Sequence, residues 1–96
     1  MILGLTRKQL DDGARLVHAS VAPTPQYSWP LLNERAGTEV WVKHENHTPT
    51  GAFKVRGGLT LIEQLKRENP KLAGVASATR GNHGQSVAYA GRRHGL

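Results

Sequence analysis

The hydrophobic period of the sequence changes at Phe53, and this change constrains the fold more than any other feature. Over residues 38–45, apolar and polar side chains alternate, as they do in a half-buried β-strand. From Phe53 onwards, apolar residues recur at every third or fourth position, which marks one face of an α-helix. The sequence therefore predicts a strand over 38–45, a loop over 46–51 and a helix that ends near Glu68, before a proline.

The remaining segments predict three more helices and one more strand. Thr6 and Gln9 form a capping box, which predicts that the first helix begins at Arg7. Gly37 is placed to end a helix of one or two turns, whereas residues 26–30 are expected to stay irregular. The predicted elements are a helix over 7–19, the short helix over 31–37, a strand over 38–45, a helix over 53–68, a strand over 74–77 and a helix over 82–93.

The main order of helix, strand, helix, strand, helix indicates an α/β fold with parallel strands. A helix between two strands returns the chain to the end of the sheet where the first strand began, so both strands run in the same direction. Two strands make an incomplete sheet with open edges and faces. We therefore expect residues 1–96 to be a truncated α/β fragment, the first part of a larger α/β protein. Residues 1–52 would hold the first helix, loop and strand, and residues 53–96 the lysine-bearing helix and a strand-turn-helix unit. The open edges predict a homo-oligomer.

Composition narrows the classes of partner. The formal net charge is +6, but the basic residues are spread along the chain in runs of no more than two, whereas a nucleic-acid binder gathers them on one face. There is no cysteine, and His44 and His47 lack the spacing of a zinc-hydrolase motif, so we expect no bound metal. No apolar run approaches the roughly 20 residues that span a bilayer, and the amino terminus has no secretory pattern. We expect a cytoplasmic protein that binds neither nucleic acid nor membrane.

Lys54 stands directly behind a turn and at the start of the predicted helix over 53–68. Partial withdrawal from water and the nearby helix N–H groups both favour the neutral amine, which is the nucleophilic form of lysine. An ordinary solvated lysine in the first turn of a helix fits the same position. The residues alone leave both interpretations open.

A second candidate site lies where the predicted strand over 74–77 passes into the following helix. In open α/β sheets, ligands bind at the carboxyl ends of strands, and the N–H groups of a helix start can hold a carboxylate or a phosphate. Gly81 permits a tight turn, Asn82 can both donate and accept hydrogen bonds, and Arg80 adds positive charge. The spacing matches neither the dinucleotide fingerprint nor the P-loop. The sequence therefore predicts an anion site at this turn.

Two segments together resemble a known enzyme family. Lys43 to Gly57 resembles the pyridoxal phosphate lysine motif of the threonine/serine dehydratases, which reads roughly K-x-E-x-x-x-x-T-G-S/A-F-K-x-R-G. Ser77 to Gln85 resembles the second motif of that family, S-x-G-N-H-x-Q. The segment from Thr24-Pro25 to Leu31-Leu32-Asn33 is similar to an early family segment, so the resemblance covers nearly the whole chain. It implies the tryptophan synthase β-like fold, which is called fold type II.

The resemblance also implies roles for individual residues. Lys54 would bind pyridoxal phosphate covalently and then remove the Cα proton of the substrate. Phe53 would pack near the cofactor ring, and Asn82 would hydrogen-bond the ring 3-hydroxyl. The pocket for the substrate carboxylate would be lined by Thr79, Arg80, Gly81 and His83.

The implied reaction is the β-elimination of water from L-threonine or L-serine, a small amino-acid substrate, to give a 2-oxo acid and ammonia. The same motifs fit a serine racemase or a 3-hydroxyaspartate ammonia-lyase of this family, and a non-catalytic fragment that associates with itself is a further alternative. Two residues depart from the family pattern: Thr79 stands where the family has serine, and Arg80 stands where the family has a small residue. The arginine would add a contact to the carboxylate or favour a more acidic substrate.

Length is the largest departure from the family. Its members are several times longer than 96 residues. Their glycine-rich phosphate-binding loop and the polar partner of the pyridine nitrogen lie further along, beyond the segments matched here. The resemblance therefore implies that this chain is an amino-terminal piece, inactive alone.

Overall fold

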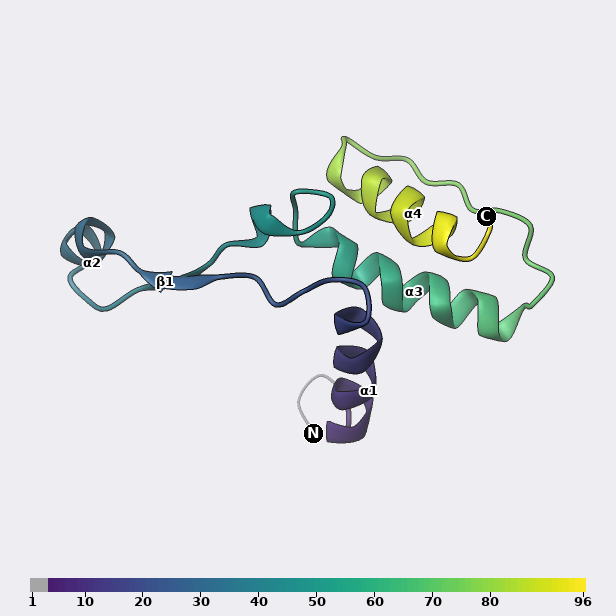
Figure 1. The fold of residues 1–96 in the computed structure, drawn as a ribbon, viewed down its shortest axis with the longest axis horizontal. Helices are drawn as coiled ribbons and strands as arrows, with labels where there is room; N and C mark the ends of the chain where they lie inside the picture. The colour runs from purple at the N-terminus through teal and green to yellow at the C-terminus, as the bar shows by residue number, and fades with distance from the viewer. Residues whose placement is uncertain (1–3) are drawn as a thin grey trace.

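Three long helices form the body of the molecule, and a narrow arm projects from that body (Figure 1). The structure is a computed structural model that describes residues 4–96. Its elements in chain order are α1 (Arg7–His18), β1 (Gln26–Ser28), α2 (Pro30–Ala36), β2 (Trp41–Lys43), the 3-10 helix η1 (Glu45–His47), α3 (Lys54–Glu68) and α4 (Asn82–Arg93). None of the helices within this range is long and apolar enough to cross a membrane.

The predicted helices are confirmed, and their ends follow from local chemistry. The capping box forms at α1, since the N–H of Gln9 donates to Thr6 Oγ1 at 3.2 Å and the N–H of Thr6 donates to Gln9 Oε1 at 2.8 Å. Helix α2 ends at Gly37, whose φ of 69° is left-handed and therefore suits glycine. Because these signals lie at the helix ends, local in the chain, the sequence alone is sufficient to predict them.

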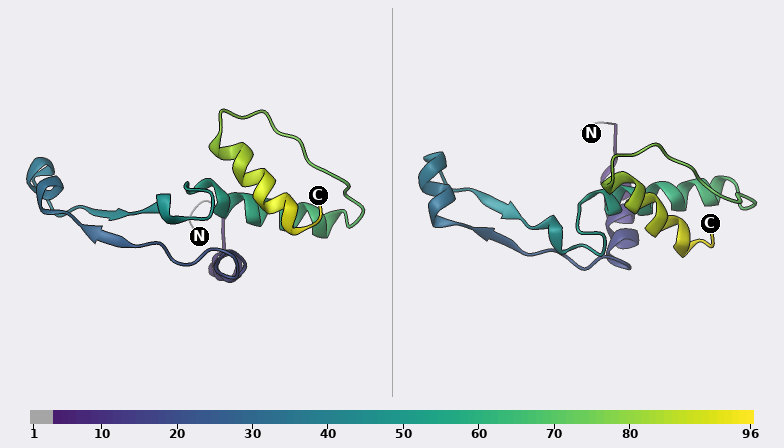
Figure 2. Two further views of the ribbon diagram at one scale, coloured as in Figure 1. Left: turned by 45° about the horizontal axis from the view of Figure 1, so that its top comes forward. Right: turned by 90° about the horizontal axis from the view of Figure 1, so that it is seen from above.

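The core lies between α3 and α4, which run side by side in each view (Figures 1 and 2). Helix α1 crosses α3 and brings the end of α1 and the residues after it against the same core. The buried apolar residues share this location, and they are Val17, Val21, Val55, Leu59, Ile62 and Ala90. The helical period that predicted α3 is thus the period of its buried face.

The arm consists of β1, α2 and β2, and it points away from the helices in all three views (Figures 1 and 2). Strands β1 and β2 are antiparallel, with Tyr27 opposite Val42. The radius of gyration, 16.2 Å, exceeds the roughly 12–13 Å of a compact domain of this length, as the projecting arm requires.

Two strand predictions are wrong. The parallel pairing expected between the strands at 38–45 and 74–77 does not form, and residues 26–28, expected to be irregular, form β1, which pairs antiparallel with β2. The pairing is antiparallel because α2 turns the chain back on itself, so that β2 returns beside β1 as in a hairpin. The predicted strand at 38–45 is reduced to Trp41–Lys43, although the alternation of exposed and half-buried side chains holds there.

The predicted strand over 74–77 is also absent from the described structure. Residues 73–79 carry no regular secondary structure, and the segment runs beside α4 without a strand partner (Figure 1). A strand is defined by ladder hydrogen bonds to a neighbouring strand, and no other segment within residues 4–96 takes that place. The helix-strand-helix-strand-helix order is therefore not the order of this structure.

Candidate functional site

The structure brings the two candidate sites of the sequence together in one open pocket. Lys54, the first residue of α3, lies beside the turn that leads into α4. The pocket has a volume of about 310 Å³ and is lined by Lys54, Thr79, Arg80, Gly81, Asn82 and His83. Six of the seven residues proposed for the site from the sequence thus share one pocket, although two separate segments supply them.

Phe53 is the exception among the proposed residues, since it does not line this pocket. Its side chain is 61% exposed, and its ring centroid lies 5.7 Å from the Nζ atom of Lys54. That distance permits a cation–π contact between the ring and the lysine ammonium. Phe53 therefore lies beside the lysine, outside the wall of the pocket.

A turn sets the position at which α3 begins. Thr48 is buried, and its hydroxyl donates to the carbonyl of Ala52 at 2.7 Å while accepting from the N–H of Ala52 at 3.0 Å. Gly51 has a φ of +73°, a conformation that costs other residues free energy. These bonds close the loop tightly in front of α3, so that Lys54 occupies the first position of the helix.

The carboxylate of Glu45 connects the start of α3 with the segment that leads into the arm. Arg56 donates to Glu45 through two nitrogens, with Nε 2.7 Å from Oε2 and Nη2 3.0 Å from Oε1, and the Thr24 hydroxyl donates to the same carboxylate. The Arg56 hydrogen bond, assisted by that of Thr24, lowers the pKa of Glu45 to about 2. Glu45 lies on η1, Arg56 on α3 and Thr24 before β1, so one group joins three parts of the chain.

Sequence reasoning assigned no role to this network. Glu45 and Arg56 both lie within the lysine motif, flanking the turn, and a bidentate pair of this kind suits arginine geometry. Their opposite charges on either side of Lys54 were the available signal. Nothing in the spacing, however, indicates that the loop would fold back to bring them into contact.

The turn at the start of α4 is built around the hydroxyl of Thr79. This oxygen accepts from the N–H of Gly81 at 3.0 Å and from the N–H of Gly84 at 2.9 Å. Gly81 has a φ of +146°, which favours glycine, and a Cβ on Gly84 would lie 2.5 Å from Cγ2 of Thr79. Thr79 thus caps the helix and holds the turn in shape.

The charges and donors around the pocket suit an anion. Lys54 and Arg80 are cationic, and no carboxylate is among the lining residues. The N–H groups of Asn82 and His83, the first two residues of α4, have no intrahelical acceptor because of their position in the helix. The pocket can therefore offer an amine, a guanidinium, an amide side chain and backbone donors to a negatively charged molecule.

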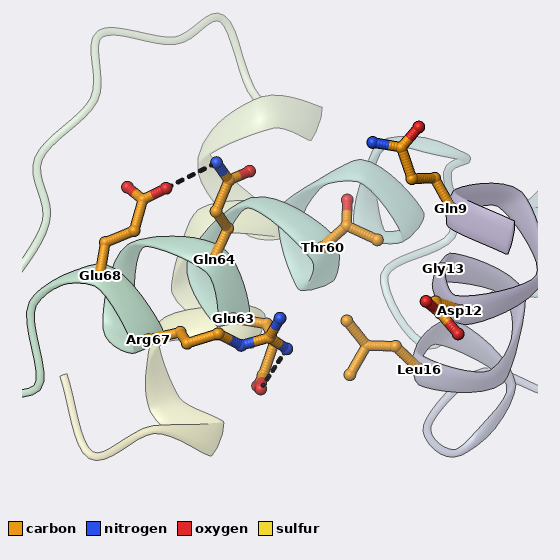
Figure 3. Close-up of a pocket in the computed structure, with 9 residues that line it drawn as sticks. All are labelled: Gln9, Asp12, Gly13, Leu16, Thr60, Glu63, Gln64, Arg67 and Glu68. Atoms are coloured by element: carbon orange, nitrogen blue, oxygen red, sulfur yellow. Dashed lines mark hydrogen bonds and ion pairs between the residues drawn. The ribbon is translucent and has the colours of Figure 1, made fainter. Parts of the chain in front are cut away.

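A larger hollow lies between α1 and α3 (Figure 3). It has a volume of about 490 Å³, and Figure 3 labels the nine residues that line it. Its polar side chains are largely paired with one another or with near neighbours, as Glu63 is with Arg67 at 3.5 Å and Gln64 with Glu68 at 2.9 Å. It holds none of the residues proposed for the site, and its polar groups already have partners.

The two histidines of the loop belong to an aromatic cluster with Tyr27 and Trp29 of the arm. The indole N–H of Trp29 donates to Nε2 of His44 at 3.0 Å, and the ring of Tyr27 lies 5.6 Å from that of His44. The ring of His47 packs edge-on against His44. Within residues 4–96, no three side chains of the types that bind metals come together.

Comparison with known proteins gives one consistent result. The family model described as pyridoxal-phosphate dependent enzyme matches residues 17–96. A biosynthetic L-threonine dehydratase of Haemophilus influenzae is 38% identical over 84 residues, which are 88% of this chain and 16% of that protein. A serine racemase of Dictyostelium discoideum is 34% identical over 88 residues, which are 92% of this chain and 27% of that protein.

Structural comparison extends this result to the fold. The crystal structure of a pyridoxal 5'-phosphate-dependent aspartate racemase superposes with a TM-score of 0.86 at 32% identity, covering 97% of this chain and 30% of that one. The chain thus spans less than a third of the length of each of these proteins. The match takes in the arm as well as the helices. This chain belongs to the family of pyridoxal phosphate-dependent enzymes, and the cofactor of its family is pyridoxal phosphate.

Proposed function

We propose that this chain supplies the cofactor-binding lysine and the substrate-carboxylate turn of an enzyme that removes water from L-threonine or L-serine to give a 2-oxo acid and ammonia. One observation carries the proposal. Lys54 and the turn from Thr79 to His83 line the same pocket, although they come from different helices and distant parts of the sequence. An amine and an anion-binding turn side by side are what an amino-acid substrate requires of such a site.

The residues present fit pyridoxal phosphate. The exposed amine of Lys54 can hold it covalently, the side chain of Asn82 can hydrogen-bond a ring hydroxyl, and the positive lining favours its negative charge. When bound, the cofactor supplies an electron sink for the Cα carbon of the substrate. The chain itself supplies position and charge.

The chemistry of the chain then divides between two groups of residues. Lys54 Nζ removes the proton from the substrate Cα, acting as a general base. Arg80 and the N–H groups of Asn82 and His83 hold the substrate carboxylate and so fix which substrate atom faces the amine. Loss of the Cβ hydroxyl as water follows, and hydrolysis of the resulting unsaturated amine releases ammonia.

Racemisation of serine is the second candidate, because it needs the same first step. Its support is the Dictyostelium relative, a serine racemase whose match covers 92% of this chain, against 88% for the Haemophilus dehydratase. Arg80 also allows more acidic substrates. Its guanidinium stands beside Lys54 and can hold a carboxylate in the side chain of the substrate. A more acidic amino acid is therefore included among the substrates to be tested.

Cofactor binding is tested directly on the chain. The chain is mixed with pyridoxal phosphate, reduced with borohydride and digested, and the adducts are located by mass spectrometry. We expect the adduct at Lys54 in preference to the exposed Lys71, and we expect Lys54→Arg to lose it. Labelling spread evenly over the lysines would contradict a formed site.

The reaction is tested in a chimaera. Residues 1–96 replace the matching segment of the Haemophilus dehydratase, and 2-oxo acid formation from threonine, serine and 3-hydroxyaspartate is measured beside the change in optical rotation of serine. We expect 2-oxo acid from threonine or serine, abolished by Lys54→Arg. Racemisation without 2-oxo acid would favour the second candidate instead.

A further inference from the structure

A buried serine joins the two helices that carry the pocket. Ser86 lies on α4 with 0% of its surface exposed, and its hydroxyl donates to the backbone carbonyl of Lys54 at 2.7 Å. Within residues 4–96, no other side-chain hydrogen bond connects α3 with α4. Neither the motifs nor the pocket lining includes this residue.

The bond lies at the level of the pocket. Its acceptor is the backbone of Lys54, whose side chain lines the pocket, and its donor stands one helical turn after Asn82. One turn of α-helix rises about 5.4 Å, so Ser86 is close to the start of α4. The bond therefore connects the lysine half of the pocket with the turn half near the point where they meet.

A glycine makes room for this contact. A Cβ on Gly58 would overlap Ser86 Oγ and would lie 3.0 Å from the backbone oxygen of Ser86. Gly58 is buried on α3, one turn after Lys54, so its missing side chain lets α4 approach at this level. Any side chain at Gly58 would displace the serine from the carbonyl of Lys54.

A hydroxyl differs from an apolar group of the same size because its hydrogen bond requires the donor and the acceptor to be aligned. The carbonyl of Lys54 has two lone pairs, and the helix bond within α3 uses one of them. The Ser86 hydroxyl occupies the other, which restricts both the sliding and the rotation of α4 against α3. An alanine would keep the Cβ but leave the Oγ position empty and these motions less restricted.

We propose that Ser86 is a positioning residue, which acts through the Lys54 backbone to hold the lysine amine in register with the turn from Gly81 to His83. The role of this register in binding the cofactor rests on the proposed function. The register itself is a property of the chain without cofactor. The two are therefore tested by separate measurements.

The first experiment measures the borohydride-trapped adduct at Lys54 in the wild type, in Ser86→Ala and in His94→Ala. The last is a matched control, because His94 Nε2 contacts Glu63 at 3.2 Å near the far end of α4, so the substitution removes a contact between the same parts of the chain away from the pocket. At equal folded fraction, we expect Ser86→Ala to lower the Lys54 adduct several-fold and the control to leave it unchanged. Equal labelling in all three, or an equal loss in both variants, would overturn the proposal.

The second experiment measures amide hydrogen exchange in the cofactor-free chain by NMR. We expect Ser86→Ala to accelerate exchange at the first turns of α3 and α4 several-fold, while the amides near Glu68 and Arg93 keep their wild-type rates. A uniform acceleration, or none, would overturn the positioning role. Should the wild type carry no preferred adduct at Lys54, the proposed function fails, and this second measurement alone decides on Ser86.

Discussion

At the scale of single residues, Glu45 links the stability of the chain to pH. The Arg56 hydrogen bond holds the pKa of Glu45 at about 2 in the folded chain, against 4.5 for a free glutamate. Between these values the unfolded chain binds more protons than the folded one, so stability rises with pH through this window. The contribution is complete above pH 4.5 and is lost as the pH falls towards 2.

We therefore expect Glu45→Gln to lower the free energy of unfolding by about 1–3 kcal/mol at pH 7 and to flatten its decline between pH 5 and pH 2. Urea denaturation at several pH values measures both effects. Glu39→Gln is the control, because Glu39 is exposed and makes no ion pair within the described residues. If the free energy of unfolding of Glu45→Gln depended on pH as that of the wild type does, the carboxylate would have no part in the pH dependence of stability.

Thr79 gives a second prediction at this scale. Thr79→Val keeps the shape of the side chain but removes the oxygen that accepts from the N–H groups of Gly81 and Gly84. Loss of a helix cap typically costs about 1 kcal/mol, and the first turn of α4 should fray. Thermal unfolding and amide exchange at Gly84 measure the two effects, and Thr79→Ser should retain wild-type values. A stable, unfrayed Thr79→Val would show that the cap contributes nothing.

At the scale of elements, two neighbouring glycines of α3 should respond in opposite ways to the same change. Gly57→Ala places a methyl in open space on an exposed helix position, so we expect a gain of about 0.5–1 kcal/mol. Gly58→Ala drives a methyl into Ser86 on the facing helix, so we expect a loss of about 1–3 kcal/mol. Chemical denaturation of both variants tests the packing of α3 on α4. Equal effects at both positions would contradict it.

The elements also separate what the sequence could predict from what it could not. Helix bounds follow from periodicity and from caps at or next to the helix ends, as the capping box of α1 and Gly37 after α2 illustrate. A strand depends on a partner that can be distant in the sequence, so the sequence alone does not indicate β1, and the prediction of a strand over 74–77 is wrong. The direction of pairing depended on α2, whose turning of the chain has no local signature.

At the scale of the whole molecule, the sequence points to candidate site residues only where they carry motifs. Lys54 and the turn before α4 stand out through their motifs, and the structure places them around one pocket. The contacts that hold them in place were not recognisable, because the Glu45–Arg56 pair and the Ser86–Lys54 bond depend on how separate elements pack. Supporting contacts of this kind require the three-dimensional structure.

The arm gives the last prediction, because it exposes apolar side chains far from the helical core. Leu31 is 82% exposed and Trp41 is 57% exposed. Exposed apolar groups gathered on a projecting element favour association, so we expect the chain to form homo-oligomers through the arm.

Leu31→Lys and Trp41→Lys should shift sedimentation towards the monomer without changing the unfolding of the core, which neither residue contacts. Leu61→Lys, an exposed leucine on α3, serves as the control and should sediment like the wild type. A wild-type chain that stays monomeric at high concentration would contradict association through the arm, and a Leu61→Lys effect equal to the others would move the interface to the helices.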